Sequence, residues 1–290
     1  MQVELIFNNT VEHGEGPVWD PVGQKLYWVD LLQGKYCKAD IFTNEVEIFS
    51  VGQPVGFLAL RKNYQGLVVG VRDGFGFYNE KENQLNLIEP SPEQDNSEVR
   101  FNDGAVDPEG RFFGGTMEWD GAENKGSLFR LNTDHSWNLL EENIHITNGM
   151  GWNPEKDTFF MIDTLRHAVY AYDYDLETGN ISNKRVYIQF TETEFPDGMT
   201  IDREGGFWIA MWEGSRIDHF DKNGVKIKEI PLPVLHPTSC CFGGKDLKTL
   251  FITTSKLPLS EKERKKSPLA GRIFKVETNT TGQIEPRFNG

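Results

Sequence analysis

A turn followed by a strand recurs six times along this chain, at intervals of about 40 to 49 residues. At three of these turns an oxygen-bearing side chain directly precedes a glycine: Glu15-Gly16, Asn148-Gly149 and Asp197-Gly198. A fixed period of this length is typical of repeat folds in which each unit is one small sheet. If the units surround one axis, equivalent positions face the same central spot, and these three side chains are expected to converge.

The strong copies of the repeat share one pattern, a short strand, a turn containing Asp or Asn, and a strand rich in aromatic and β-branched residues. They cover residues 14–30, 101–117, 147–163 and 196–211, and weaker copies begin near Pro54 and Thr238. No stretch with helical periodicity is long enough to build alternating strands and helices. The sequence therefore predicts an all-β fold, a six-bladed β-propeller with a metal site in its central channel.

The even spread of the repeat favours a single domain over residues 1–290, because no long Gly- or Ser-rich linker interrupts it. A propeller has to close its ring, commonly by pairing strands from both ends of the chain. We expect residues 2–7 to complete the blade that contains residues 272–277. Residues 256–270, which directly precede that last strand, form a charged segment that is expected to be a surface loop.

Composition excludes several classes of partner. The formal net charge of −14 repels nucleic-acid phosphate and anionic membranes. No run approaches the roughly 18 apolar residues of a membrane helix, and the first residues lack a basic and then apolar leader pattern. The three cysteines, Cys37, Cys240 and Cys241, have neither a disulfide framework nor zinc-ligand spacing. We therefore expect a cytoplasmic protein, monomeric or weakly homo-oligomeric, that binds a small molecule.

The residues before the repeated glycines suggest which cation the channel would hold. Two carboxylates, Glu15 and Asp197, and the amide of Asn148 supply oxygen ligands, which suit Ca²⁺, Mg²⁺ or Mn²⁺. The alternative is that Asp and Asn before Gly only form turns, although Glu15 is a poor turn residue. Asp103-Gly104 shares the register, so periodicity alone does not decide which three or four residues bind the ion.

Specific strings in the chain carry a family resemblance. They are Glu15-Gly-Pro-Val-Trp, Arg100-Phe-Asn-Asp-Gly, Gly115-Thr-Met, Asn148-Gly-Met-Gly-Trp, Tyr172-Asp-Tyr-Asp, Ile181-Ser-Asn, Pro196-Asp-Gly-Met and Thr238-Ser-Cys-Cys-Phe-Gly-Gly. Together they resemble the SMP-30/gluconolactonase/luciferin-regenerating enzyme family, also known as regucalcin-like proteins, over essentially the whole chain. The resemblance implies a six-bladed propeller with one catalytic divalent cation, which could be calcium, zinc, manganese or magnesium.

The resemblance also implies roles for individual residues. Glu15, Asn148 and Asp197 correspond to the metal ligands, the set that the repeat indicates independently. Arg100 and Asn102 correspond to residues that contact substrate. A further carboxylate of the family lies a few residues beyond Gly-Thr-Met; Asp120 stands at that spacing and Glu118 is closer, so both remain candidates for substrate binding.

The activity implied by the resemblance is metal-dependent opening of a sugar lactone, such as a gluconolactone, to its hydroxy acid. The cation would polarise the carbonyl and activate water, and Asp197 would act as the base. Residues 120–126, a polar loop bounded by glycine, are a candidate lid. Two alternatives stay open: a metal-dependent phosphotriester or aryl-ester hydrolase, and a non-enzymatic calcium-binding regulator or propeller scaffold.

Overall fold

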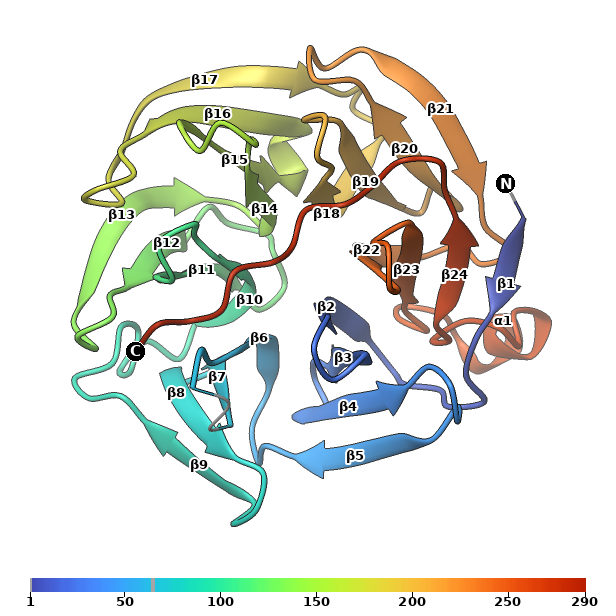
Figure 1. Ribbon diagram of the computed structural model, residues 1–290, viewed down its shortest axis with the longest axis horizontal. Coiled ribbons are helices and arrows are strands. Elements are labelled where there is room, and N and C mark those ends of the chain that lie inside the picture. Colours follow the sequence, from blue (N-terminus) through green and yellow to red (C-terminus); the bar gives the residue numbers. More distant parts are fainter. Residues whose placement is uncertain (1, 64–65) are drawn as a thin grey trace.

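A computed structural model describes residues 2–63 and 66–290. Six antiparallel sheets of four strands each are arranged as a ring around a central axis (Figure 1). In five of them the strands follow one another in chain order from the axis outward. The prediction of an all-β, six-bladed propeller is confirmed.

The first three blades contain consecutive strands joined by short turns. Their strands are β2 (Gly14–Asp20), β3 (Lys25–Asp30), β4 (Lys35–Asp40) and β5 (Val46–Ser50); β6 (Val55–Leu60), β7 (Leu67–Val71), β8 (Gly74–Asn79) and β9 (Gln84–Leu87); and β10 (Val99–Val106), β11 (Phe112–Glu118), β12 (Gly126–Leu131) and β13 (Trp137–Ile144). The innermost strands β2, β6 and β10 carry the residues that lie nearest the axis (Figure 1).

The last three blades repeat this plan. Their strands are β14 (Thr147–Trp152), β15 (Thr158–Asp163), β16 (Ala168–Tyr174) and β17 (Ile181–Gln189); β18 (Phe195–Ile201), β19 (Phe207–Trp212), β20 (Arg216–Phe220) and β21 (Lys226–Pro231); and β22 (Pro237–Gly243), β23 (Thr249–Thr254), β24 (Phe274–Glu277) and β1 (Val3–Leu5). The sixth blade therefore takes its outer strand from the beginning of the chain.

Closure of the ring pairs a strand from the beginning of the chain with a late strand in that sixth blade. β1 pairs antiparallel with β24, with Glu4 opposite Lys275. Just after β1, the buried ring of Phe7 stacks on Trp28 of the first blade at a centroid distance of 5.6 Å. The N-terminal segment thus contacts both sides of the junction between the sixth and first blades.

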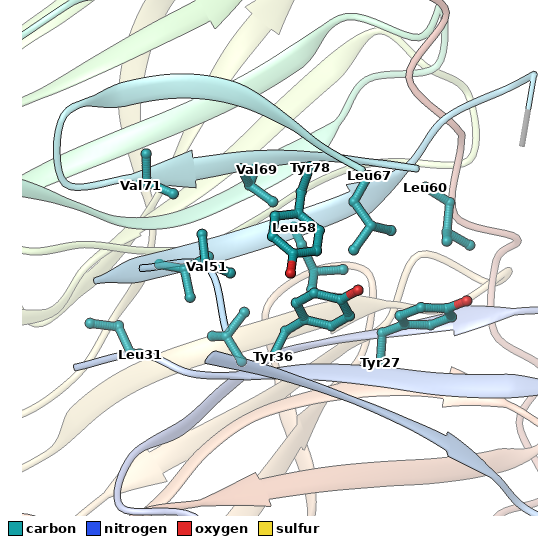
Figure 2. Packing of buried hydrophobic residues seen from close by; sticks show 12 residues of the cluster. Tyr27, Leu31, Tyr36, Val51, Leu58, Leu60, Leu67, Val69, Val71 and Tyr78 are labelled. Atoms are coloured by element: carbon teal, nitrogen blue, oxygen red, sulfur yellow. The ribbon is translucent and has the colours of Figure 1, made fainter. Parts of the chain in front are cut away.

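Apolar side chains fill the wedges between neighbouring sheets. Between the first and second blades, Tyr36 and Tyr78 lie among aliphatic side chains from both sheets (Figure 2). Each ring buries its apolar body while its hydroxyl finds an acceptor, Glu80 Oε1 at 2.9 Å for Tyr36 and the carbonyl of Ser50 at 2.9 Å for Tyr78. Such pairing lets a polar aromatic residue occupy a core position without an unsatisfied group.

The repeated Asp or Asn of the first turn stabilises its own turn. Asp107 Oδ1 accepts from the backbone N–H of Arg111 at 2.8 Å, and Asp202 Oδ1 accepts from that of Gly206 at 2.8 Å. Asn153 Oδ1 accepts from Thr158 N–H at 3.0 Å in the same way. These residues therefore have a local structural role, which separates them from the acids that precede glycine.

Acid is expected to weaken the turn of the fifth blade through Asp202. Burial opposes ionisation, but hydrogen bonds from His219, the Trp208 indole and the backbone N–H groups of Gly206 and Glu204 outweigh it and hold the pKa below the ordinary 3.8. A carboxyl with a lowered pKa stabilises the fold at neutral pH and loses that contribution as the pH falls through its folded value. Urea titrations from about pH 4.5 to pH 2.5 should therefore show a shallower loss of unfolding free energy in Asp202→Asn than in the wild type. Equal slopes would contradict this account.

Two segments outside the blades were not fully predicted. The charged segment 256–270 contains a short helix, α1 (Glu261–Lys266), that begins with a capping box between Ser260 and Glu263. The last residues of the chain, red in Figure 1, run across one face of the ring over its centre. Within the described residues, no helix has the length and apolarity needed to cross a membrane.

Candidate functional site

All six innermost strands depart from regular pairing at the same level. The register with the neighbouring strand shifts between Glu15 and Val18, Val55 and Phe57, Phe101 and Asp103, Asn148 and Met150, Pro196 and Met199, and Pro237 and Ser239. A β-bulge turns a side chain away from the alternation of its strand, and bulges are common next to active sites. The residues that precede glycine in the sequence repeat therefore lie in bulges near the axis.

The glycines at this level allow the inner strands to approach one another. A Cβ atom on Gly149 would lie 2.4 Å from the backbone nitrogen of Met199 in the next blade, and one on Gly56 would lie 2.8 Å from the carbonyl oxygen of Asn102. Both distances are too short for any side chain, so only glycine fits. The close approach brings the preceding side chains of different blades to one place.

A cavity of about 280 Å³ lies at this place, at the start of the inner strands. Five of the predicted site residues line it: Glu15, Arg100, Asn102, Asn148 and Asp197. The remaining polar lining comes from His13, Thr164 and Glu213, and the apolar lining comes from Met117, Ile146, Leu165, Phe195 and Trp212. The cavity thus combines an acidic, amide-containing part with an apolar part.

Buried carboxyl groups outnumber cationic groups at this cavity. Glu15 and Asp197 are each about 6% exposed. Burial, followed by the charge of Asp103, raises the pKa of Glu15; burial, followed by the charges of Glu15 and Asp103, raises the pKa of Asp197. Arg100 opposes both shifts, but a single guanidinium does not compensate three nearby carboxyl groups.

These residues fit a hard divalent cation. Carboxylate and amide oxygens are the ligands that Ca²⁺ and similar ions prefer, and a bound cation would offset the buried negative charge. Over residues 2–63 and 66–290, no group of three or more His, Cys, Asp and Glu side chains is arranged to hold a metal by itself. A cation here would therefore depend on the amide oxygen of Asn148 in addition to the two carboxylates.

Arg100 and Asn102 lie side by side in the cavity. Arg100 Nη1 donates to Asn102 Oδ1 at 2.6 Å and to the carbonyl of Phe101 at 3.2 Å. Burial lowers the pKa of Arg100 to about 10, while Glu15 and Asp197 act in the opposite direction, so the guanidinium stays charged at neutral pH. Its Nε–H is buried and has no hydrogen-bond partner in the part of the chain that the structure describes.

Asp103, which shares the register of the candidate ligands, faces a different space. It lines a second cavity of about 230 Å³, formed by the later residues of the same inner strands and by Gln283 and Glu285 of the C-terminal segment. Its carboxylate accepts from the N–H of Gly104 at 2.7 Å. Burial raises the pKa of Asp103 to about 7. Asp103 therefore influences the first cavity by charge, without lining it.

Glu118 and Asp120 are not among the residues that line the first cavity. Glu118 Oε2 accepts from the N–H of Glu123 at 2.9 Å, within the loop that we expected to be a lid. Asp120 is exposed at the turn after β11. Between them, Trp119 lies 5.8 Å from the Arg100 guanidinium. In this conformation the structure does not bring either carboxylate to the other site residues.

The other eight lining residues were not predicted as site residues; His13, Thr164 and Trp212 are three of them. His13 shares a hydrogen bond with Ser255 Oγ at 2.8 Å, and burial, with Arg100 and His236, lowers its pKa to about 3, so its ring is neutral. Thr164 begins a short 3₁₀ helix, Thr164–Arg166, and Trp212 ends strand β19. All three adjoin a copy of the repeat, residues 14–30, 147–163 and 196–211 respectively, but none recurs at the equivalent position of the other strong copies.

Fold and cavity together define a class: a six-bladed propeller with an acidic, oxygen-rich pocket at one end of its channel. Comparison with known proteins agrees with this class. A family model described as the SMP-30/Gluconolactonase/LRE-like region matches residues 13–256. The chain therefore belongs to the SMP-30/gluconolactonase/LRE-like family.

Individual relatives align over nearly their whole length. A putative sugar lactone lactonase, YvrE, of Bacillus subtilis is 36% identical over 281 residues, which cover 96% of this chain and 95% of that protein. Human regucalcin is 37% identical over 283 residues, which cover 95% and 94%. A crystal structure of a calcium-binding protein, regucalcin, from Agrobacterium tumefaciens superposes with a TM-score of 0.93 at 23% identity, covering 98% of this chain and 96% of that one.

Proposed function

We propose that this protein is a divalent-cation-dependent lactonase that opens a sugar lactone, such as a gluconolactone, to its hydroxy acid. The observation that carries the proposal is the meeting of two carboxylates, an amide and a guanidinium around one cavity. The name of one relative, a putative sugar lactone lactonase, supports the same activity. The description of one structural neighbour as calcium-binding supports Ca²⁺ as the first cation to test.

The residues of the cavity have separate roles in cation binding and proton transfer. Glu15, Asn148 and Asp197 would hold the cation, which when bound supplies Lewis-acid polarisation of a carbonyl and lowers the pKa of water. Asp197 takes a proton from the attacking water as the new C–O bond forms. It returns that proton to the ring oxygen as the lactone C–O bond breaks. The reaction consumes one water and yields one hydroxy acid.

Arg100 and Asn102 would position the substrate. The unpaired Nε–H of Arg100 is a buried donor, and such groups are normally satisfied by a ligand or by water. A guanidinium offers several donors in a fixed plane, which suits a substrate with adjacent oxygens. The Asn102 amide is held by Arg100 at its oxygen and by Thr147 and Asn148 at its NH₂ group, so the second lone pair of Oδ1 is the part left for a substrate.

The apolar lining keeps a second substrate class open. Phe195 and Trp212 could pack against the C–H face of a sugar ring, and with Leu165 they could equally hold an acyl chain or aryl group. A phosphotriesterase or aryl esterase is therefore the second candidate.

The buried cysteines, none of which forms a disulfide in the part of the chain that the structure describes, support the predicted reducing, cytoplasmic setting.

The decisive experiment is a pH-stat assay with D-glucono-δ-lactone, a long-chain acyl lactone and a phosphotriester, each with Ca²⁺ and with chelator. We expect fastest acid release from gluconolactone, lost with chelator and restored by excess cation. Faster turnover of either other substrate would replace the proposed substrate. Absence of any cation-dependent acid release would favour a non-enzymatic calcium-binding regulator or scaffold.

A further inference from the structure

The two amide side chains of the cavity belong to one row of hydrogen bonds. Arg100 Nη1 donates to Asn102 Oδ1, and Asn102 Nδ2 donates to Asn148 Oδ1 at 2.9 Å. Asn148 Nδ2 donates to Thr164 Oγ1 at 2.7 Å, and Thr164 Oγ1 donates to the carbonyl of Pro196 at 2.7 Å. The row therefore crosses three blades and ends at the residue before Asp197.

Two backbone carbonyls fix the direction of every bond in this row. The carbonyl of Pro196 can only accept, so the single hydroxyl proton of Thr164 is committed to it. Thr164 can then only accept from Asn148, which forces the NH₂ group of that amide toward Thr164. In the same way, the carbonyl of Thr147 accepts from Asn102 Nδ2 at 2.8 Å and fixes that amide.

The consequence for Asn148 is that its oxygen stays on the side away from Thr164. That oxygen accepts one hydrogen bond from Asn102 and keeps a second lone pair for another partner. Asn148 is 5% exposed and Thr164 is 7% exposed, so water does not readily replace either contact. Without the Thr164 hydroxyl, the NH₂ group would be left buried and unpaired, and the amide would turn to find another acceptor.

We propose that Thr164 is a positioning residue for the cation site. Its hydroxyl holds the Asn148 amide with the oxygen available to a cation, and through Pro196 it fixes Asn148 relative to Asp197 in the next blade. This inference rests on the proposed function, because it assumes that Asn148 and Asp197 share a cation. Groups that orient metal ligands in this way typically change metal affinity by about 10- to 100-fold when they are removed.

The test compares the Ca²⁺ affinities of three variants, measured by calorimetric titration. Thr164→Val removes the hydroxyl but keeps the shape, and Thr164→Ser keeps the hydroxyl. Thr254→Val is the matched control, because the fully buried hydroxyl of Thr254 also donates to one backbone carbonyl, that of Arg272 at 2.6 Å, and does not line the cavity. We expect Ca²⁺ affinity to fall about 10- to 100-fold in Thr164→Val only.

The outcomes separate this inference from the proposed function. Unchanged Ca²⁺ affinity in Thr164→Val, or an equal loss in Thr254→Val, would overturn the positioning role and leave the proposed function intact. A wild-type protein that binds no divalent cation would overturn both. If Thr164→Val does not fold, Thr164→Ala removes the same hydroxyl with less crowding, and failure of Thr164→Ser to retain wild-type affinity would also count against the role.

Discussion

Replacing Asp197 by asparagine is expected to reduce lactone hydrolysis to the uncatalysed background. The substitution keeps the size of the side chain but removes a carboxylate that is both the proposed cation ligand and the proposed base. The loss of Ca²⁺ affinity should exceed the about 100-fold that marks the upper range for groups that only orient a ligand. Calorimetric calcium titration and pH-stat assays on the same preparation measure the two effects separately.

Asp103→Asn is the matched control for this substitution. Asp103 also precedes a glycine in an inner strand and also contributes negative charge to the site, but it lines the second cavity. Neutralising it should change Ca²⁺ affinity by less than about 10-fold, because only a longer-range charge interaction is lost. If the two substitutions had equal effects, Asp197 would act only through its charge and its assignment as ligand and base would be wrong.

The largest expected change in stability follows from Trp208→Ala. Trp208 is fully buried between the fifth and sixth blades, stacks on His219 at 3.8 Å and packs edge-on against Phe242. Its indole Nε1 also donates to Asp202 Oδ2 at 2.9 Å. We expect the substitution to lower the unfolding free energy by about 3–5 kcal/mol, measured by urea denaturation.

Trp208→Phe distinguishes packing from hydrogen bonding at this position. Phenylalanine retains most of the buried ring but leaves Asp202 without the indole donor, for which a loss of about 1–3 kcal/mol is expected. If Trp208→Ala lowered the unfolding free energy by less than about 1 kcal/mol, the fifth and sixth blades would have repacked into the space left by the indole. Large core truncations do not usually behave in this way.

The propeller could be predicted because each blade carries the same local signals. In each strong copy of the repeat, a turn is followed by a strand of apolar and aromatic residues. The side chain of a turn residue such as Asp107 or Asp202 accepts a hydrogen bond from the backbone of that turn. Helix α1 was missed because six residues are too few to show a helical period. Its capping box, Ser260 and Glu263, was the available signal. The course of the C-terminal segment across the ring has no counterpart in the repeat.

The candidate site was predictable where it follows the repeat or the family strings, which indicated Arg100 and Asn102. Glu15, Asn148 and Asp197 share a register, so their presence in one cavity follows from the ring, whereas their role in binding a cation stays a prediction. Thr164 occupies a position outside the shared motif, and its role depends on a hydrogen bond to the carbonyl of Pro196 in a neighbouring blade. Contacts of this kind depend on the side-chain conformations and cannot be read from spacing.

The same bulge recurs in all six inner strands, so the side chains of the pocket can be exchanged between blades without altering the sheets. Six positions around the axis are geometrically equivalent, and the outer strands of each sheet do not depend on which residue occupies them. Donor atoms can therefore be added, removed or moved from one blade to another by single substitutions. One scaffold can thereby accommodate a succession of different chemistries while its sheets remain the same.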